Sequence, residues 1–401
     1  TAGIAGRVQP PDGNHLEESG GDGGMILSDV CEFIVDCPHS TAPDEGKGYP
    51  LIRTPNVGKG RLDLNGVHRV SESVYKQRIQ RGAPRANDLI FAREAPAGNV
   101  ALVQENQTVC LGQRTVLIRP NVQKVNPQYL VYYLLSPKPQ YELLGTANGA
   151  TVAHVNLPAI RNLKIELPEK SVQDKIGTIL VTYDDLIENN QKQIKLLEEA
   201  AQRLYKEWFV DLRFPGHENT KIVDGVPEGW HRGTIGQIAE FKRGRTITKA
   251  QVKEGNVPVI AGGLEPAYYH NVANTKAPVI TISASGANAG FVRLYGVDVF
   301  ASDCSFVDGL GTESLFFVYE FLKESKVSID QLQKGSAQPH VYAKDINAMK
   351  ITIPEKEYLE RFDRYAKVYF NKIKTLQGQN ERLKTARDLL LPKLMSGEAE
   401  V

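Results

Sequence analysis

The sequence predicts an α+β protein built from two globular domains in tandem, each followed by a long helix, with the two helices pairing as an antiparallel coiled coil. Two observations predict this plan. The second half of the chain repeats the first at an offset near 186 residues, and each half ends in a polar, helix-forming run whose apolar residues recur every seven positions. The boundaries that follow are 1–24 for a tail, 25–168 and 214–353 for the domains, and 169–213 and 354–401 for the helices.

Composition and charge limit the classes of function. A chain of 401 residues is long enough for two or three domains with their own cores. Residues 25–168 carry 16 basic and 12 acidic side chains, and residues 214–353 carry 14 of each, so neither domain is basic enough to hold nucleic acid by charge alone. Contacts with nucleic acid should therefore be local, or partner subunits should supply many of them. With no membrane-spanning run and no metal-type cysteine spacing, we expect a cytoplasmic protein with buried thiols and no metal.

The first domain alternates short apolar runs with loops. Residues 1–24 are rich in Gly, Pro and acidic side chains and predict a disordered tail or an added remnant before Met25. Strands are predicted at Leu89–Ala92, Val100–Val103 and Thr115–Ile118, and a short helix at Asn126–Leu135. The connecting loops are rich in Gly, Pro and Arg, most clearly at 54–61 and 78–85.

The central helix is predicted over 171–212. Its two apolar columns hold Leu180, Ile187, Ile194, Ala201 and Trp208 in one, and Ile176, Tyr183, Leu197 and Leu204 in the other. These columns are the a and d positions of a coiled-coil seam, and Asn190 interrupts the d column once. Ser171 is a suitable N-cap, and Pro215 with Gly216 ends the helix.

An internal repeat defines the second half of the chain. The segment 163–170 (LKIELPEK) recurs as 349–356 (MKITIPEK), and upstream matches pair Gly98 with Gly290 and Glu32-Phe33 with Glu240-Phe241. The globular halves have diverged more than the helical ends. The order is therefore domain, helix, domain, helix.

The C-terminal helix carries a matching seam. Its d column holds Phe362, Tyr369, Leu376, Leu383 and Leu390, and its a column holds Ala366, Ile373 and Leu394 with the polar Asn380 and Arg387. An antiparallel pair faces a against d, so Asn190 can face Asn380. This register sets small Ala201 against large Tyr369, which suits close packing. A buried Asn pair costs stability but fixes register, so Asn190 and Asn380 are the predicted register-setting residues.

A helix pair with a globular domain at each end is a spacer of defined length. From Ile176 to Trp208 the helix spans about 48 Å at about 1.5 Å per residue, comparable to about 14 base pairs at about 3.4 Å each. Two reading heads could then address two separated sites. Because the heads differ in sequence, their sites should differ too.

Six segments carry a resemblance to one known family. They are CEFIVDCP (31–38), the glycine-rich 48–61, LGQRTVLIRP (111–120), WFVDLRFPG (208–216), GVPEGW (225–230) and LLLPKLMSG (389–397). Together they resemble the specificity (S) subunits of type I restriction and modification systems. The resemblance covers nearly everything after Met25, and its motifs sit at the expected places within a duplicated plan.

The resemblance implies two target recognition domains, each reading one half of an asymmetric, bipartite sequence of double-stranded DNA, with the helices setting the spacer. It implies assembly with two methyltransferase (M) subunits and, for cleavage, two ATP-dependent motor and nuclease (R) subunits. Adenine methylation from S-adenosylmethionine and cleavage would belong to those partners. This chain would then be non-catalytic and bind no cofactor itself. Leu186 and Phe209, which lie off the seam, are candidates to dock methyltransferase subunits, or else to cover loops of the same chain.

The candidate DNA-binding residues of the first domain are basic side chains in or beside loops. Gly58 and Gly60 let the backbone approach a phosphate, and Lys59 and Arg61 lie beside them. Further candidates are Arg78, Arg81, Arg93 and Arg114, because arginine pairs with guanine through two hydrogen bonds. A solvated surface charge is the alternative for each.

The second domain offers six candidates: Lys242, Arg243, Arg245, Ser285, Asn288 and Gln338. The first three form the densest basic cluster. Ser285 and Asn288 belong to the small, glycine-rich SASGANAG (283–290), for which a tight strand connection is the alternative. Gln338 and His340 follow a glycine, and Asn148 occupies the equivalent loop of the first domain.

Two other functions compete with DNA recognition. One is a self-contained DNA-acting enzyme, although the chain has no Asn-Pro-Pro-aromatic methylation motif and no Walker A loop. Asp36, Glu45 and Lys47 imitate a nuclease set only loosely. His154 and His340 lack a nearby carboxylate or nucleophile in sequence, which favours structural roles. The other competing function is a coiled-coil scaffold that binds only proteins. We predict no catalytic site.

Overall fold

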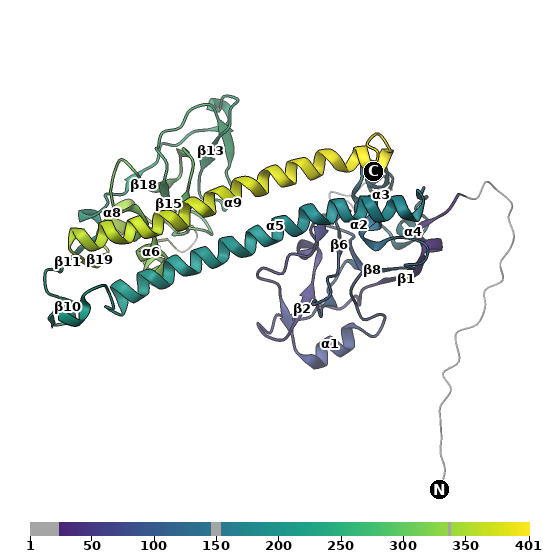
Figure 1. Ribbon diagram of the computed structural model, residues 1–401, viewed down its shortest axis with the longest axis horizontal. Helices are drawn as coiled ribbons and strands as arrows, with labels where there is room; N and C mark the ends of the chain where they lie inside the picture. The colour runs from purple at the N-terminus through teal and green to yellow at the C-terminus, as the bar shows by residue number, and fades with distance from the viewer. Residues whose placement is uncertain (1–23, 146–153, 336–337) are drawn as a thin grey trace, which may run out of the picture. The chain divides into compact units, whose positions relative to one another are not determined.

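The computed structural model describes residues 24–145, 154–335 and 338–401 (Figure 1). The expected tail lies outside the described residues except for Gly24, and so does Asn148. The chain divides into two compact units, one of Thr1–Asp185 with Lys384–Val401 and one of Leu186–Leu383. We call them the first unit and the second unit. Each contains one globular domain and parts of both long helices.

The first unit is built on a five-stranded sheet with the strand order β1-β8-β5-β6-β3, and a three-stranded sheet has the order β4-β2-β7. The strands are β1 (Cys31–Asp36), β2 (Tyr49–Ile52), β3 (Gly60–Arg61), β4 (Arg69–Val70), β5 (Leu89–Ala92), β6 (Val100–Leu102), β7 (Cys110–Leu111) and β8 (Thr115–Pro120). The three predicted strands are present as β5, β6 and β8. Every residue of β5 and β6 is buried, which explains why these runs are wholly apolar.

Short helices complete the first unit. They are α1 (Glu72–Arg78), α2 (Pro127–Leu135), α3 (Pro137–Gly145) and α4 (Leu157–Arg161), with the 3-10 helices η1 (Leu27–Val30) and η2 (Thr54–Asn56). Helix α2 begins at Pro127 because Asn126 caps it: Oδ1 of Asn126 accepts a 3.0 Å hydrogen bond from the amide of Tyr129. Tyr129 is part of a buried core that also holds Ile176 and Leu180 of the central helix.

The second unit is built on a four-stranded sheet with the order β12-β18-β15-β16, accompanied by β14-β13-β17 and by the pairs β10-β9 and β11-β19. The strands are β9 (Ile222–Val223), β10 (Val226–Pro227), β11 (His231–Thr234), β12 (Lys242–Arg243), β13 (Val257–Ile260), β14 (Tyr268–His270), β15 (Val279–Ser283), β16 (Val292–Tyr295), β17 (Phe300–Ala301), β18 (Cys304–Asp308) and β19 (Lys350–Ile353). The short helices are η4 (His217–Asn219), η5 (Ile235–Gln237), η6 (Lys249–Gln251), α6 (Leu315–Glu324), α7 (Lys326–Gln331) and α8 (Ala343–Asn347).

The two units repeat one strand ladder. Strand β5 lies between β8 and β6, and β15 lies in the same way between β18 and β16. The edges of the repeat agree as well: the amide of Leu27 donates to the carbonyl of Leu163 at 2.9 Å, and the amide of Ile235 donates to that of Met349 at 3.0 Å. The repeat read from the sequence is therefore a repeat of structure.

The two long helices are α5 (Lys170–Tyr205) and α9 (Lys356–Ser396). The segment predicted as helix up to 212 leaves the α-helical form after Tyr205 and makes one π-helical turn, η3 (Lys206–Val210). This wider turn lets the neighbours Trp208 and Phe209 both reach Phe362, at ring distances of 6.2 and 5.3 Å. No helix in the described ranges combines the length and apolar character that a membrane span needs.

Helices α5 and α9 touch within each unit. In the second unit, the side-chain amide of Asn190 donates a 2.9 Å hydrogen bond to Oδ1 of Asn380, and both residues are buried. Ala201 of α5 and Ala366 of α9 belong to the same buried cluster. In the first unit, Arg387 of α9 bonds to a carboxylate of α5, that of Asp184.

Candidate nucleic-acid interface

In the second unit, three candidate residues gather at one end of the four-stranded sheet. Arg243 ends β12, and its Nη2 lies 3.5 Å from Oδ1 of Asp303, in the turn before β18. Ser285, in the loop between β15 and β16, donates its hydroxyl to the other oxygen of the same carboxylate. Asn288 of this loop donates to the carbonyl of Gly262 at 3.3 Å. The loop thus joins Arg243 in one polar cluster.

The other candidates of the second unit lie next to this cluster. Lys242 and Arg245 flank Arg243 in sequence, and both are exposed. Gln338 is exposed as well, and the nearby His340 forms a backbone bridge with Ser285. All six predicted residues of this unit are therefore in or beside a single region of its surface.

In the first unit, two of the six candidates form a similar cluster. Arg114 is exposed, and its Nη1 lies 3.0 Å from Oε2 of Glu94. Arg93 is largely covered, because its guanidinium contacts Asp36 at 2.7 Å and Nε2 of His154 at 2.8 Å. Nδ1 of His154 in turn lies 2.5 Å from Glu94. His154, for which the sequence offered no nearby carboxylate, thus has one in the fold.

The two clusters lie on the same arrangement of backbone, which we call the frame: the end of the central strand of the sheet, the start of a neighbouring strand, and the hydrogen bond that joins them. In the first unit the amide of Arg93 donates to the carbonyl of Arg114 at 2.9 Å. In the second unit the amide of Ala284 donates to the carbonyl of Asp303 at 3.2 Å. Both bonds join the residue after the central strand, β5 or β15, to the residue before its neighbour, β8 or β18. Arg114 and Asp303 therefore occupy equivalent positions.

The loops that follow β5 and β15 are closed by equivalent hydrogen bonds. The amide of Gly98 donates to the carbonyl of Ala92 at 2.9 Å, and that of Gly290 donates to Ser283 at 2.9 Å. Both glycines have positive φ, 88° and 86°, a conformation that residues with a Cβ rarely adopt. The matched glycines seen in the sequence thus mark the same turn in each domain.

Arg61 and Arg78 make internal contacts instead. Arg78 is 5% exposed, and its guanidinium donates to the carbonyls of Leu111 and Pro38 at 3.4 Å. Arg61 forms ion pairs with the carboxylates of α5, including one at 4.0 Å to Asp184. A Cβ on Gly60 would lie 2.6 Å from Oδ2 of Asp184, so that glycine makes room for the carboxylate. The role the structure gives these two arginines is to hold segments of the first unit together.

Lys59 and Arg81 remain accessible. Both are exposed, and Arg81 uses one guanidinium nitrogen to donate to the carbonyl of Cys37 at 3.2 Å. Lys59 forms no ion pair with another described residue. Both side chains keep donors that face solvent.

Glu94 and Asp303 were missed by sequence reasoning. An acidic residue is not selected as a DNA-binding candidate by its charge. In the fold, however, each of these two lies beside an exposed arginine, Arg114 or Arg243. The sequence signal that could have located them is their position in the repeat, just before or after the matched strands.

Asp36 and Glu45, which the enzyme hypothesis placed in one nuclease site, contact different side chains in the structure. Asp36 pairs with Arg93, whereas Glu45 accepts hydrogen bonds from the amide and hydroxyl of Ser71 at 3.2 and 3.0 Å. Within the described ranges, no group of three His, Cys, Asp or Glu side chains is arranged to hold a metal ion.

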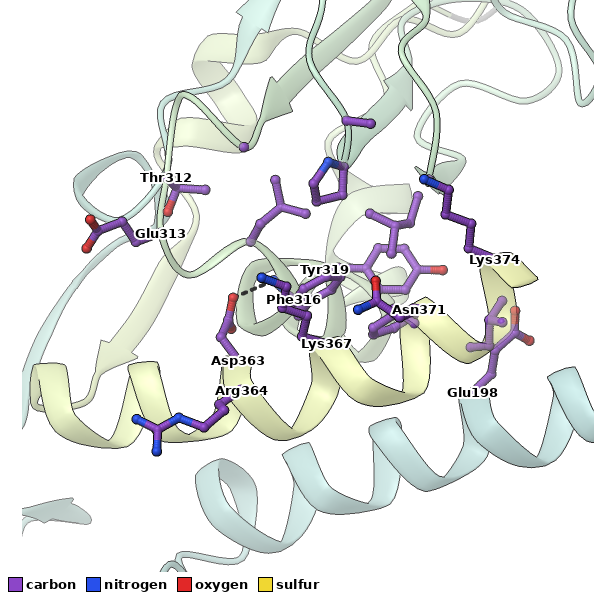
Figure 2. A pocket seen from close by; sticks show the side chains of 18 of the residues that line it. Glu198, Thr312, Glu313, Phe316, Tyr319, Asp363, Arg364, Lys367, Asn371 and Lys374 are labelled. Atoms are coloured by element: carbon purple, nitrogen blue, oxygen red, sulfur yellow. Dashed lines mark hydrogen bonds between the residues drawn. The ribbon is translucent and has the colours of Figure 1, made fainter. Parts of the chain in front are cut away.

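A cleft of about 690 Å³ in the second unit lies along α9 and the start of α6 (Figure 2). Asp363 on its wall accepts hydrogen bonds from the amides of Phe316 and Phe317 at 3.1 and 2.9 Å and so caps α6. Burial raises the pKa of Asp363 to about 7, against the opposing effect of these amides. Of the described residues that line the cleft, none is a candidate DNA-binding residue.

Comparisons with known proteins agree with one another. Residues 25–199 and 227–385 match the family described as "Type I restriction modification DNA specificity domain". The MjaIX specificity subunit of Methanocaldococcus jannaschii is 28% identical over 362 residues, which cover 84% of this chain and 83% of that protein. The HindI specificity subunit of Haemophilus influenzae is 22% identical over 405 residues, with 79% and 87% covered.

One solved structure is similar over nearly the whole chain. It is the crystal structure of the type I restriction-modification system S subunit from M. genitalium, with a TM-score of 0.59 and 18% identity. The match covers 93% of this chain and 95% of that one. The two proteins therefore share a fold.

Proposed function

The chain belongs to the type I restriction-modification DNA specificity family, and we propose that it is the DNA-reading subunit of such a system. Each domain would read one half of an asymmetric, bipartite target. The observation that carries this proposal is the repeated backbone frame, which presents a different set of polar side chains in each unit. A repeated frame suits two reading heads, and different side chains suit two different half-sites.

We further propose that α5 and α9 pair as an antiparallel coiled coil and that this pair sets the unread spacer. The 2.9 Å hydrogen bond between Asn190 and Asn380 supports this register, because a polar pair in an apolar seam is satisfied in one alignment. The helical span from Ile176 to Trp208, about 48 Å, corresponds to about 14 base pairs.

Partner subunits would carry the chemistry. We propose that two methyltransferase subunits with S-adenosylmethionine, and motor and nuclease subunits with ATP, act in the cytoplasm on the DNA that this non-catalytic chain selects. The balanced charge of the chain, +1, supports a need for partners that add phosphate contacts.

Leu196 and Val368 are 64% and 65% exposed on the long helices and are suitable docking residues, as is Leu186. Phe209 is less suitable because its ring packs on Phe317 at 4.8 Å.

Co-expression with the cognate methyltransferase subunit, followed by methylome sequencing of the host, tests the proposal. We expect one new methylated motif with two different half-sites and a fixed gap. A stable complex that methylates DNA without any sequence preference would contradict the reading role. The methyltransferase subunit expressed alone is the control, and it should leave no bipartite motif.

A further inference from the structure

The equivalence of the two frames extends to the first strand of each sheet. In the β1–β8 ladder, Asp36 lies opposite the residue two places after Arg114. In the β12–β18 ladder, Arg243 lies opposite the residue two places after Asp303. Since Arg114 and Asp303 are equivalent, Asp36 and Arg243 are equivalent too.

The frame thus has two charged positions, one at the end of the first strand and one before the neighbouring strand, and each position carries opposite charges in the two units. The first unit has a carboxylate at the end of its first strand, Asp36, and an arginine before β8, Arg114. The second unit has the arginine at the strand end, Arg243, and the carboxylate before β18, Asp303. In both cases the arginine is the exposed member: the side chains of Arg114 and Arg243 are 62% and 60% exposed.

Each exposed arginine lies beside a carboxylate that a third side chain orients. Glu94, 3.0 Å from Arg114, is held by His154, and Asp303, 3.5 Å from Arg243, is held by the hydroxyl of Ser285. Glu94 and Ser285 are themselves equivalent, because they directly follow Arg93 and Ala284, whose amides make the equivalent hydrogen bonds of the two frames. A guanidinium that is already oriented loses less conformational freedom on binding and keeps its remaining donors for a ligand.

The other arginines of these regions differ in burial or in partners. Arg61, Arg78 and Arg93 are covered by internal contacts. Arg81 and Arg245 are exposed, and within the described part of the chain neither forms an ion pair with a carboxylate. Exposure together with an orienting carboxylate therefore singles out one arginine in each cluster.

We propose that Arg114 and Arg243 are the specificity-determining arginines of the two domains, each reading a guanine in the half-site of its own domain. The inference rests on the proposed function. The planar guanidinium can donate two hydrogen bonds to O6 and N7 of guanine in the major groove. The arginine lies directly before β8 in one domain and at the end of β12 in the other, so the same backbone can read two different half-sites.

The test uses the full chain in complex with its methyltransferase subunit, as wild type and with Arg114→Lys or Arg243→Lys. Binding and methylation are measured on duplexes in which each base pair of the wild-type motif is replaced in turn. Lysine keeps the charge but loses the two-pronged geometry. We expect Arg114→Lys to lower discrimination roughly 5- to 100-fold at one guanine of one half-site, and Arg243→Lys to do so in the other half-site only.

Two further sets of variants make the outcome clear. Arg114→Gln and Arg243→Gln should relax the same positions and leave the salt dependence of DNA binding nearly unchanged, whereas the loss of a phosphate contact would lower that dependence by about one charge. Arg85→Lys and Arg232→Lys are matched controls on exposed arginines outside the clusters, and they should leave both half-sites unchanged.

Full discrimination in the Lys and Gln variants at every position would overturn the inference, and so would a single variant that relaxes both half-sites. In either case a bipartite motif for the wild-type complex would still support the proposed function. A wild-type complex without any bipartite motif would overturn both.

Discussion

At the scale of single residues, Asp184 joins three separate segments of the first unit. Its side chain is 3% exposed and accepts a 2.5 Å hydrogen bond from the hydroxyl of Tyr132 on α2. Arg387 of α9 bonds to the other oxygen, and Nε of Arg61 lies 4.0 Å away. One polar position on α5 therefore ties α2, α9 and the β3 segment to the same point.

We expect Asp184→Ala to lower the free energy of unfolding of the first unit by about 3 kcal/mol, because it leaves Arg387 without its buried partner. Tyr132→Phe should cost only about 1 kcal/mol, since it removes one hydrogen bond and keeps the packing. Urea denaturation measures both. Asp185→Ala is the matched control: that side chain is 61% exposed and pairs with Arg61 at the surface, so its loss should cost less than about 1 kcal/mol. Equal stability of the two Asp variants would contradict the prediction.

A second residue links stability to pH. Glu320 on α6 is 2% exposed, and burial raises its pKa from the ordinary 4.5 to about 8. Lys323 lowers this pKa, whereas Glu198 and Glu324 raise it further. Between pH 4.5 and 8 the folded state keeps a proton that the unfolded chain releases. The contribution of Glu320 is thus present in full below this window and is lost as pH rises through it.

Glu320→Gln should remove this dependence. We expect the wild-type protein to lose on the order of 3 kcal/mol relative to the variant between pH 5 and pH 8. Urea unfolding of both proteins at several pH values gives the difference directly. Glu313→Gln, at an 85% exposed side chain just before α6, is the control. Parallel stability curves for wild type and Glu320→Gln would contradict the assignment.

The sequence identifies charged candidate residues, but it does not show which side chains surround them in the fold. Arg61 and Arg114 have the same chemistry and both lie within two residues of a glycine, yet one is tied to α5 and the other faces solvent. The difference comes from partners that are distant in sequence, such as Asp184. Candidate lists based on residue type therefore included the exposed arginines, but only the fold separated them from those that hold the structure together.

At the scale of elements, local periodicity explains what could be predicted. The heptad columns located α5 and α9 because a seven-residue repeat is visible without tertiary contacts. The π-helical turn Lys206–Val210 was not predictable in this way, because it depends on Phe317 and Phe362 packing against Phe209. Elements set by their own pattern were found, and those set by distant partners were not.

The buried asparagine pair allows a test of how α5 and α9 match within the second unit. Asn380→Leu should destabilise this unit by about 1–3 kcal/mol, because Asn190 loses its partner while remaining buried. The double variant Asn190→Leu/Asn380→Leu should recover most of this loss, since two apolar side chains can pack in the same space. A double-mutant cycle by urea denaturation measures the coupling. If the losses of stability in the single variants Asn190→Leu and Asn380→Leu simply add up in the double variant, the two residues are not coupled.

At the scale of the whole molecule, the sequence predicted the duplication, with the order domain, helix, domain, helix. The antiparallel pairing predicted from the heptad columns also sets the end of the C-terminal helix beside the start of the central helix. In the structure, residues 384–401 belong to the first unit, where Leu394 is buried in the core and the carbonyl of Val401 accepts a 3.1 Å hydrogen bond from Lys175. The repeat alone does not reveal this return, because the return depends on the orientation of the two helices and on side chains far apart in the sequence.

If α5 and α9 together set the spacer, then changing their length should change the gap between the half-sites. We consider matched insertions beside Ile194 in α5 and beside Leu376 in α9, which face each other in the proposed register. One extra turn in both helices adds about 5.4 Å and should lengthen the gap by one or two base pairs, and a full heptad adds about 10 Å and should lengthen it by about three. The heptad insertion also preserves the phase of the apolar seam.

Methylome sequencing with the cognate methyltransferase subunit measures the gap for each insertion. Both half-sites should keep their bases, because the inserted residues lie outside the two clusters that contain Arg114 and Arg243. A heptad inserted in α5 alone is the control, since it shifts the facing residues and should weaken the complex instead of lengthening the gap. An unchanged gap in a stable, active complex with the matched heptads would mean that something other than the helix pair sets the spacer.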